Sequence, residues 1–484
     1  MTISSFPRFL VIALLFSMLS GLSSADDLNL PDLGDSASAI VSHQQEHDLG
    51  QAFLRLYRNR VPEFGDPLLT SYLESILEHI ARYSKLEDKH LDLIVISNPQ
   101  INAFAAPGGI VGVNSGTFLY AQSESELAGV LSHELAHLSQ RHFARGVENS
   151  QNASLPTIAG MLGGMILMAT GAGQAGMAAI ASTQAASMQS AMHFSRQNEQ
   201  EADNIGFQTL VAAGFDPTGM TTMFEHLLEG TRFNGQKVPP FLLDHPITEQ
   251  RIAESRARLV NVPLKPHYDD NLEYQLMRVR VQLFYEENPQ KAVKRFQSEI
   301  DGESLNLTAS RYGLALAQTK THQYDEAEKN LRVLLKEHPE QNTFLLSLAD
   351  LDFERQKYPE SLQLVSAILK NDPKHYPARL LQSKILRSTK NYTDAEQVLQ
   401  DLSKDRPGDA DVWYQLAETR GQAGNIAGVY LARAEFYVLN GVFDKAKQQL
   451  NFAQKLLANN YVMTEKIKQR LLEIDALEKM SLQI

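Results

Sequence analysis

The apolar residues between positions 42 and 83 repeat at steps of three and four, which is the spacing of one face of a helix. One group repeats over residues 49–56 and another over residues 68–80, so we predict two amphipathic helices. Helical spacing returns at Ser123, where a serine followed by acidic residues is typical of a helix start. We therefore expect a third helix from that point.

The pattern differs between residues 91 and 114. Two short apolar stretches, 91–96 and 109–114, lie there with Pro107 and Gly108 between them. Short apolar stretches bounded by turn residues predict strands rather than helices. We expect a small β-sheet, and hence an α+β domain built from this sheet and the helices around it.

An internal repeat takes over after about residue 265. A tyrosine and a proline each return at intervals of 34 residues: Tyr324, Tyr358 and Tyr392, and Pro339, Pro373 and Pro407. This period is the signature of tetratricopeptide repeats (TPRs), in which each repeat is a pair of helices. The predicted fold is mostly α, with the α+β domain followed by an α-helical TPR solenoid.

Two further copies extend the array. One is expected around Pro289–Ala292, and another at Phe443–Ala446, which lies 17 residues beyond the regular period. We infer an added helix or loop near Gly421–Gly428. Stacked helix pairs form a curved groove that usually binds protein, although an array can also serve packing alone.

The first 25 residues combine the basic Arg8 with an apolar run over residues 9–19 and small residues up to Ala25. This order is typical of a secretory signal peptide, and we predict cleavage after Ala25. A membrane anchor is disfavoured because the run is shorter than the roughly 20 residues of a spanning helix. The absence of cysteine from the sequence excludes a lipoprotein signal and a disulfide, and it leaves His, Asp and Glu as the ligands for any transition metal.

The formal net charge is −12, which argues against nucleic acid as the main partner because phosphate binding draws on clustered Lys and Arg. Charge is unevenly spread: residues 149–195 hold no Asp, Glu, Lys or Arg. This charge-free stretch has three interpretations: a lid or loop beside a site, a buried helical hairpin, or insertion into a membrane. Peripheral membrane association therefore stays open.

The candidate chemistry is concentrated in residues 133–137, His-Glu-Leu-Ala-His, an HExxH motif with helical spacing around it. Residues four apart share one face of a helix, so His133 and His137 can direct imidazole nitrogens at one Zn²⁺. Glu134 then lies beside the metal as a candidate general base. With 14 histidines in the chain, a chance match to this motif is improbable.

A catalytic zinc needs a third protein ligand, and residues 196–206 supply candidates. Glu199 and Asp203 are four residues apart and hence on one face of a second helix. Glu199 can complete the metal site while Asp203 orients a ligand histidine through its far nitrogen. Glu201 lies on another face and is expected to be structural.

The HExxH motif and the downstream Glu-x-Glu-Ala-Asp-x-x-Gly pattern together resemble peptidase family M48. The resemblance also covers residues 102–109, which look like the edge strand that precedes the family's metal helix. It extends to Asp244-His245-Pro246 and Arg251, which look like the family's His-Pro-x-x-x-x-Arg segment. Four ordered motifs are far more specific than one.

This resemblance implies a Gly-Glu-zincin metalloprotease fold with one zinc ion held by His133, His137 and Glu199. It implies that Glu134 is the general base. We count Asp203 with Glu134 among the catalytic residues, because it can orient a ligand histidine. For members with a signal peptide and TPRs, it implies a periplasmic endopeptidase that also acts as a chaperone. Unfolded or misassembled outer-membrane proteins would be its substrates, and its TPR groove would contact the β-barrel assembly machinery.

His245 is the ambiguous residue. It can be a structural histidine at the turn before Pro246, a transition-state hydrogen-bond donor, or a fourth zinc ligand that acts as a latch. Arg196 and Arg251 are candidates for holding this region together.

We predict a signal peptide over residues 1–25, a metalloprotease domain over residues 26–264 and a TPR domain over residues 265–484. A zinc endopeptidase with a recruiting array accounts for all of the motifs. Two alternatives remain. One is a TPR scaffold or chaperone whose protease domain is silent. The other is an integral-membrane protease, which the charge-free stretch keeps open.

Overall fold

The computed structural model describes residues 41–149, 185–233, 241–242, 245–260, 262, 272–302 and 306–481. The predicted signal peptide, most of the charge-free stretch and the predicted boundary between residues 264 and 265 lie outside these ranges. In the described ranges the chain is mostly helical, with one three-stranded sheet. No helix among them is long and apolar enough to span a bilayer.

The two helices predicted ahead of the sheet are α2 (His43–Arg58) and α3 (Pro67–Tyr83). Ser42 caps α2 and Asp66 caps α3, each through a side-chain oxygen that accepts hydrogen bonds from the first turn. Such caps satisfy amide groups that a helix start leaves without partners. Both helices bury their apolar faces, so the prediction from spacing is confirmed.

The sheet consists of β1 (Asp92–Ile96), β2 (Ala103–Ala106) and β3 (Ile110–Asn114), in the order β1-β3-β2. β1 is parallel to β3 and β2 is antiparallel to it, which leaves β2 at an edge. Gly112 of β3 lies under the ring of Phe104, where a Cβ would fall 2.2 Å from the ring. The predicted sheet is confirmed, including the edge strand that the family resemblance implied.

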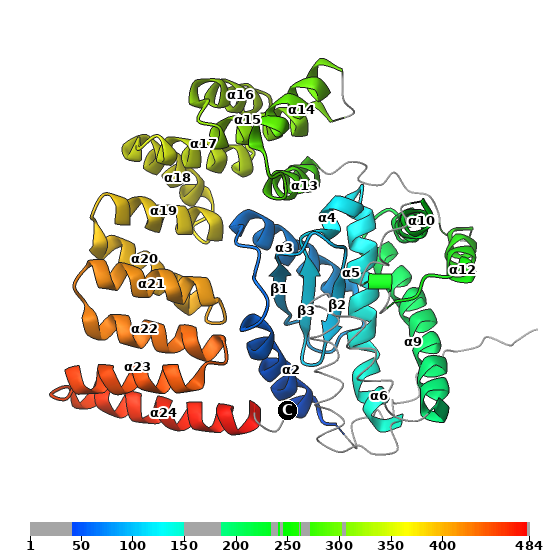
Figure 1. The fold of residues 1–484 in the computed structure, drawn as a ribbon, viewed down its shortest axis with the longest axis horizontal. Coiled ribbons are helices and arrows are strands. Elements are labelled where there is room, and N and C mark those ends of the chain that lie inside the picture. Colours follow the sequence, from blue (N-terminus) through cyan, green and yellow to red (C-terminus); the bar gives the residue numbers. More distant parts are fainter. Residues whose placement is uncertain are drawn as a thin grey trace, which may run out of the picture.

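The third predicted helix is α5 (Glu124–Ser139), which Ser123 caps as expected. α5 lies between the sheet and α9 (Ala185–Ala212), as Figure 1 shows. The two helices approach closely at Gly206, where a Cβ would lie 3.0 Å from the backbone of His133. Glycine at this position therefore brings side chains of α9 next to those of α5.

Other helices frame this pair. In chain order they are α4 (Thr117–Tyr120), α6 (His142–Asn149), α10 (Thr218–Phe233) and α12 (Glu249–Leu259). α6 follows α5 after a sharp turn, α10 packs on α5, and α12 packs on α10. The helix pair α5 and α9 thus has the sheet on one side and α10 and α12 nearby.

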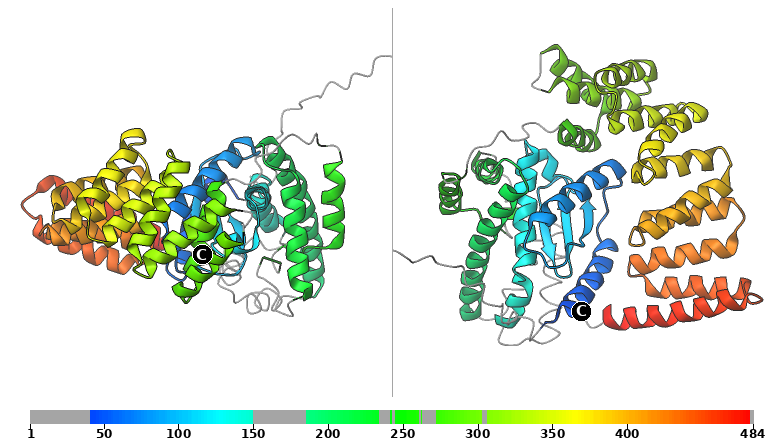
Figure 2. Two further views of the ribbon diagram at one scale, coloured as in Figure 1. Left: turned by 90° about the horizontal axis from the view of Figure 1, so that it is seen from above. Right: turned by 180° about the vertical axis from the view of Figure 1, so that it is seen from behind.

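The C-terminal half is a succession of helices that forms an arc beside α2 and α3 (Figures 1 and 2). Its elements are α13 (Leu272–Phe284), α14 (Pro289–Asp301), α15 (Leu307–Lys320), α16 (Tyr324–Glu337), α17 (Asn342–Glu354), α18 (Tyr358–Asn371), α19 (Tyr376–Ser388), α20 (Tyr392–Asp405), α21 (Ala410–Gln422), α22 (Ile426–Leu439), α23 (Phe443–Leu456) and α24 (Tyr461–Ser481). From α14 to α24 consecutive helices pack against one another, as expected for TPRs, and α13 packs on α15.

The predicted period appears in the backbone of the turns. Residues with positive φ recur at intervals of 34: His322, Gln356, Lys390 and Gly424. A second tight turn of the same kind, at Gly441, joins α22 to α23. Two tight turns therefore follow one another around α22, so the element that we inferred near Gly421–Gly428 is a helix.

The array docks on the first part of the chain through α13, which contacts α4 and α3. Tyr274 stacks on Phe118 with ring centroids 5.5 Å apart and donates a 2.7 Å hydrogen bond to the carbonyl of Ala121. Arg280 donates a 2.7 Å hydrogen bond to Asp66, the cap of α3. One hydrophobic core runs through both parts of the chain. The array therefore packs directly against the sheet-containing part and shares a hydrophobic core with it.

Candidate metal centre

The two histidines of the HExxH motif lie one turn apart on α5, on the side that faces α9. Their Nε2 atoms are 3.0 Å apart. The side chain of His133 is 1% exposed and that of His137 is 16% exposed. The four-residue spacing therefore brings two imidazole nitrogens to one point, as predicted.

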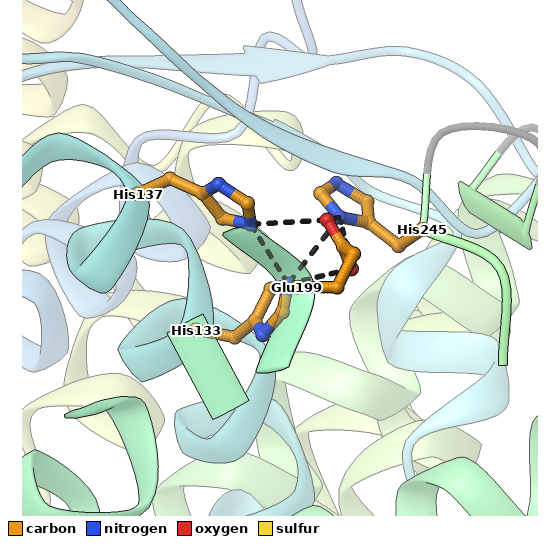
Figure 3. A group of neighbouring side chains, drawn as sticks. All are labelled: His133, His137, Glu199 and His245. Atoms are coloured by element: carbon orange, nitrogen blue, oxygen red, sulfur yellow. Dashed lines mark hydrogen bonds and ion pairs between the residues drawn. The ribbon is translucent and has the colours of Figure 1, made fainter. Parts of the chain in front are cut away.

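Glu199 on α9 and His245, which precedes α12, add two groups. The Glu199 carboxylate lies 3.4 Å from Nε2 of both α5 histidines. Nδ1 of His245 lies 3.1 Å from Glu199 and 3.3 Å from Nε2 of His133. Figure 3 shows the four side chains pointing toward one another. One ligand atom from each lies within 4.8 Å of all the others.

These separations suit a four-coordinate metal ion. Ligands at about 2.0–2.1 Å from a tetrahedral zinc ion lie about 3.3 Å from one another. Five of the six pairs among these groups have donor atoms 3.0 to 3.4 Å apart, when the nearer Glu199 oxygen is taken for each histidine. All four groups offer one atom within 4.8 Å of the others. Imidazole nitrogen and carboxylate oxygen are also ligands that zinc accepts. The four groups therefore fit a single metal ion.

Asp203 lies one turn beyond Glu199 on α9 and is fully buried. Its Oδ1 lies 3.0 Å from Nδ1 of His133, an ion-pair contact that is poorly aligned for a hydrogen bond. Arg251 donates to both oxygens of Asp203, at 2.7 and 2.8 Å, and lies 3.0 Å from Glu199. Burial acts to raise the pKa of Asp203, but His133 and Arg251 together lower it to about 2. An ionised Asp203 favours a proton on Nδ1 of His133, which leaves Nε2 free to bind a metal.

Glu134 points at the same centre from α5. It is 1% exposed, and its Oε1 lies 3.5 Å from Nε2 of His245 and has no hydrogen-bond partner among the described residues. Burial raises the pKa of Glu134 above its ordinary value. A buried carboxylate with a free oxygen and a raised pKa is suited to accept a proton from water at this centre.

The two α5 histidines differ in their protonation. Burial lowers the pKa of His137 to about 3, so its imidazole is neutral. Burial also acts to lower the pKa of His133, but the carboxylates of Asp203 and Glu199 outweigh it and raise that pKa to about 10. A metal ion at the four groups would therefore compete with a proton for His133.

No sequence pattern indicated His142 of α6. Its Nδ1 lies 2.8 Å from Nδ1 of His137, and its Nε2 lies 3.1 Å from Glu201. Glu201 faces away from the four groups and also accepts a 2.8 Å hydrogen bond from Arg145. The one available signal was a histidine five residues after the motif, where a turn could fold it back. Arg196 is exposed on α9, whereas Arg251 lies at the site.

An HExxH helix beside a second helix that supplies a carboxylate, with a buried glutamate between them, defines a metallopeptidase. The chain belongs to peptidase family M48. Residues 67–259 match this family, and residues 312–376 and 352–419 match tetratricopeptide repeats. The comparison thus agrees with the resemblance read from the motifs.

Relatives match along most of the chain. A protein of Vibrio cholerae is 35% identical over 444 residues, which are 91% of this chain and 90% of the relative. The β-barrel assembly-enhancing protease of Escherichia coli is 34% identical over 434 residues, which are 89% of this chain and 87% of the relative. A more distant relative is the mitochondrial metalloendopeptidase OMA1 of Schizosaccharomyces pombe, 29% identical over 44% of this chain and 62% of the relative.

Proposed function

We propose that this protein is a zinc-dependent endopeptidase of the periplasm that degrades misassembled outer-membrane β-barrel proteins and promotes the assembly of others. The observation that carries the proposal is the extent of the likeness to the β-barrel assembly-enhancing protease of Escherichia coli, which covers 89% of this chain and both of its parts. The signal-peptide pattern of residues 1–25 supports export from the cytoplasm.

Zinc is the metal that the donor set favours, with His133, His137 and Glu199 as its ligands. A bound zinc ion would supply Lewis acidity, which polarises a peptide carbonyl and makes water acidic enough to lose a proton near neutral pH. Glu134 accepts that proton as general base and returns it to the leaving amine. Asp203 assists by orienting His133 through its Nδ1.

The edge strand β2 is suited to hold the substrate. It pairs with β3, contacts α5 and places Ala105 beside Glu134. An extended peptide added to β2 would bring one of its peptide bonds next to Glu134. Because strand addition reads the backbone more than the side chains, unfolded or stalled chains would be natural substrates.

We assign peptide-bond chemistry to residues 26–264 and partner binding to the TPR domain, residues 265–484. The partners proposed for the TPR groove are outer-membrane proteins and the β-barrel assembly machinery. A photoreactive amino acid at the exposed Tyr414, compared with one at the exposed Tyr83 of α3, tests this assignment in intact cells. Crosslinks to these partners from the array are expected. Their absence along the array would contradict the assignment.

His245 is proposed to be a latch that occupies the fourth position of the metal when no substrate is bound. Replacing His245 by alanine is then expected to raise casein cleavage and to cause self-cleavage, because an imidazole no longer blocks that position. A rate lower by about 10²- to 10³-fold would instead make His245 a transition-state donor. An unchanged rate with unchanged zinc would make it structural. His226→Ala, at the partly exposed His226 of α10, is the control.

A further inference from the structure

α6 places His142 against the far side of His137, away from the other metal-facing groups. His142 is 7% exposed, and its Nδ1 lies 2.8 Å from Nδ1 of His137. Two imidazole nitrogens at this distance share one proton, because a hydrogen bond needs one donor and one acceptor. The contact therefore couples the proton positions of the two rings.

Only one arrangement of protons satisfies every contact when His137 binds a metal through Nε2. Nδ1 of His137 then carries a proton and donates to the bare Nδ1 of His142. The proton of His142 must lie on Nε2, which donates to Glu201 Oε2 at 3.1 Å. Arg145 donates to the same oxygen at 2.8 Å. The chain of donors thus runs from His137 to an ionised carboxylate.

We propose that His142, held by Glu201 and Arg145, is a positioning residue for His137. It fixes the tautomer and the ring orientation in which Nε2 of His137 faces the metal. In this role it does for His137 what Asp203 does for His133. The inference rests on the proposed metal site and assigns an orienting residue to its second histidine ligand.

The backbone that delivers His142 is strained. Arg141 has a φ of 49°, in the left-handed region, which is unfavourable for a residue other than glycine. Its side chain donates a 3.0 Å hydrogen bond to Glu46 and a 2.6 Å hydrogen bond to the carbonyl of Val41. These contacts hold the sharp turn between α5 and α6. This turn places His142 beside His137, so the unfavourable backbone conformation of Arg141 occurs where the contact between the two histidines is formed.

Zinc affinity, measured by competition with a chelator, tests the proposal on the full chain. His142→Leu fills the space but offers no acceptor, and it is expected to weaken zinc binding roughly 10- to 100-fold. His142→Asn keeps an acceptor oxygen near the position of Nδ1 and is expected to recover most of the affinity. The absorption spectrum of bound Co²⁺ should change in His142→Leu and return toward the wild-type spectrum in His142→Asn.

The matched control is His226→Leu, which replaces a histidine that contacts Glu126 away from the site and should leave zinc affinity unchanged. If His142→Leu does not fold, Glu201→Leu and Glu201→Gln take its place, because the Glu201 side chain is 35% exposed. The leucine should weaken binding and the glutamine should preserve it. Wild-type affinity and an unchanged Co²⁺ spectrum in the leucine variants would overturn the inference alone. No zinc binding by the wild-type protein would overturn the proposed function as well.

Discussion

Replacing Glu134 by glutamine is expected to lower casein cleavage by roughly 10²- to 10⁴-fold. The amide keeps the shape of a side chain that is 1% exposed, but it accepts no proton. Glu134 is not one of the four groups that fit a metal, so zinc content and thermal stability should stay at wild-type values. Cleavage and zinc content measured on the same sample check both halves of this expectation.

The control for Glu134→Gln is the same substitution at Glu229, which is exposed on α10. Glu229→Gln should cleave casein at the wild-type rate. If Glu134→Gln at full zinc occupancy cleaved casein as fast as the wild type, Glu134 would have no part in the mechanism. This substitution could then no longer be used to test whether the protease domain is silent.

Replacing Arg251 by methionine is expected to destabilise the protein by about 3–5 kcal/mol. Arg251 is 5% exposed and contacts the carboxylates of both Asp203 and Glu199. Methionine fills a similar space but leaves two buried negative charges without their cation. Urea unfolding of the two proteins measures the difference.

Arg256→Met, on the same helix, is the matched control for Arg251. The Arg256 side chain is 65% exposed and pairs with Glu225, so its loss should cost no more than about 1 kcal/mol.

The pKa of Asp203 is lowered from 3.8 to about 2, so its ion pair stabilises the fold above about pH 4 and this contribution is lost as the pH falls toward 2. The difference in the free energy of unfolding between the wild type and Arg251→Met should therefore become smaller as the pH falls. Equal stability of the two proteins at neutral pH would contradict the assigned role of Arg251.

The elements that could be predicted from the sequence are those determined by residues close to one another along the chain. The spacing of apolar residues predicted α2, α3 and α5, and the 34-residue period predicted the helix pairs, because each pattern repeats within one helix or one repeat. The same reasoning placed His133 and His137 on one face of a helix. It also placed Glu199 and Asp203 on one face of α9.

Other features depend on how distant segments meet. His142 reaches His137 only because Arg141 adopts a positive φ, which sequence spacing does not reveal for an arginine. Arg251 was a candidate, but its contacts with the carboxylates of Glu199 and Asp203 follow from where α12 lies when it packs on α10. The docking of α13 through Tyr274 likewise joins segments far apart in the chain.

The account rests on one zinc ion at the four groups being required for peptide-bond cleavage. Titrating Zn²⁺ into chelator-stripped protein, with casein cleavage measured after each addition, tests this most directly. We predict that activity rises in proportion to added zinc and levels off at about one ion per chain. We also predict that Glu199→Gln does not regain activity over the same range, because a neutral amide is a poorer ligand than a carboxylate. Full casein cleavage by the stripped protein before any zinc is added would contradict the account.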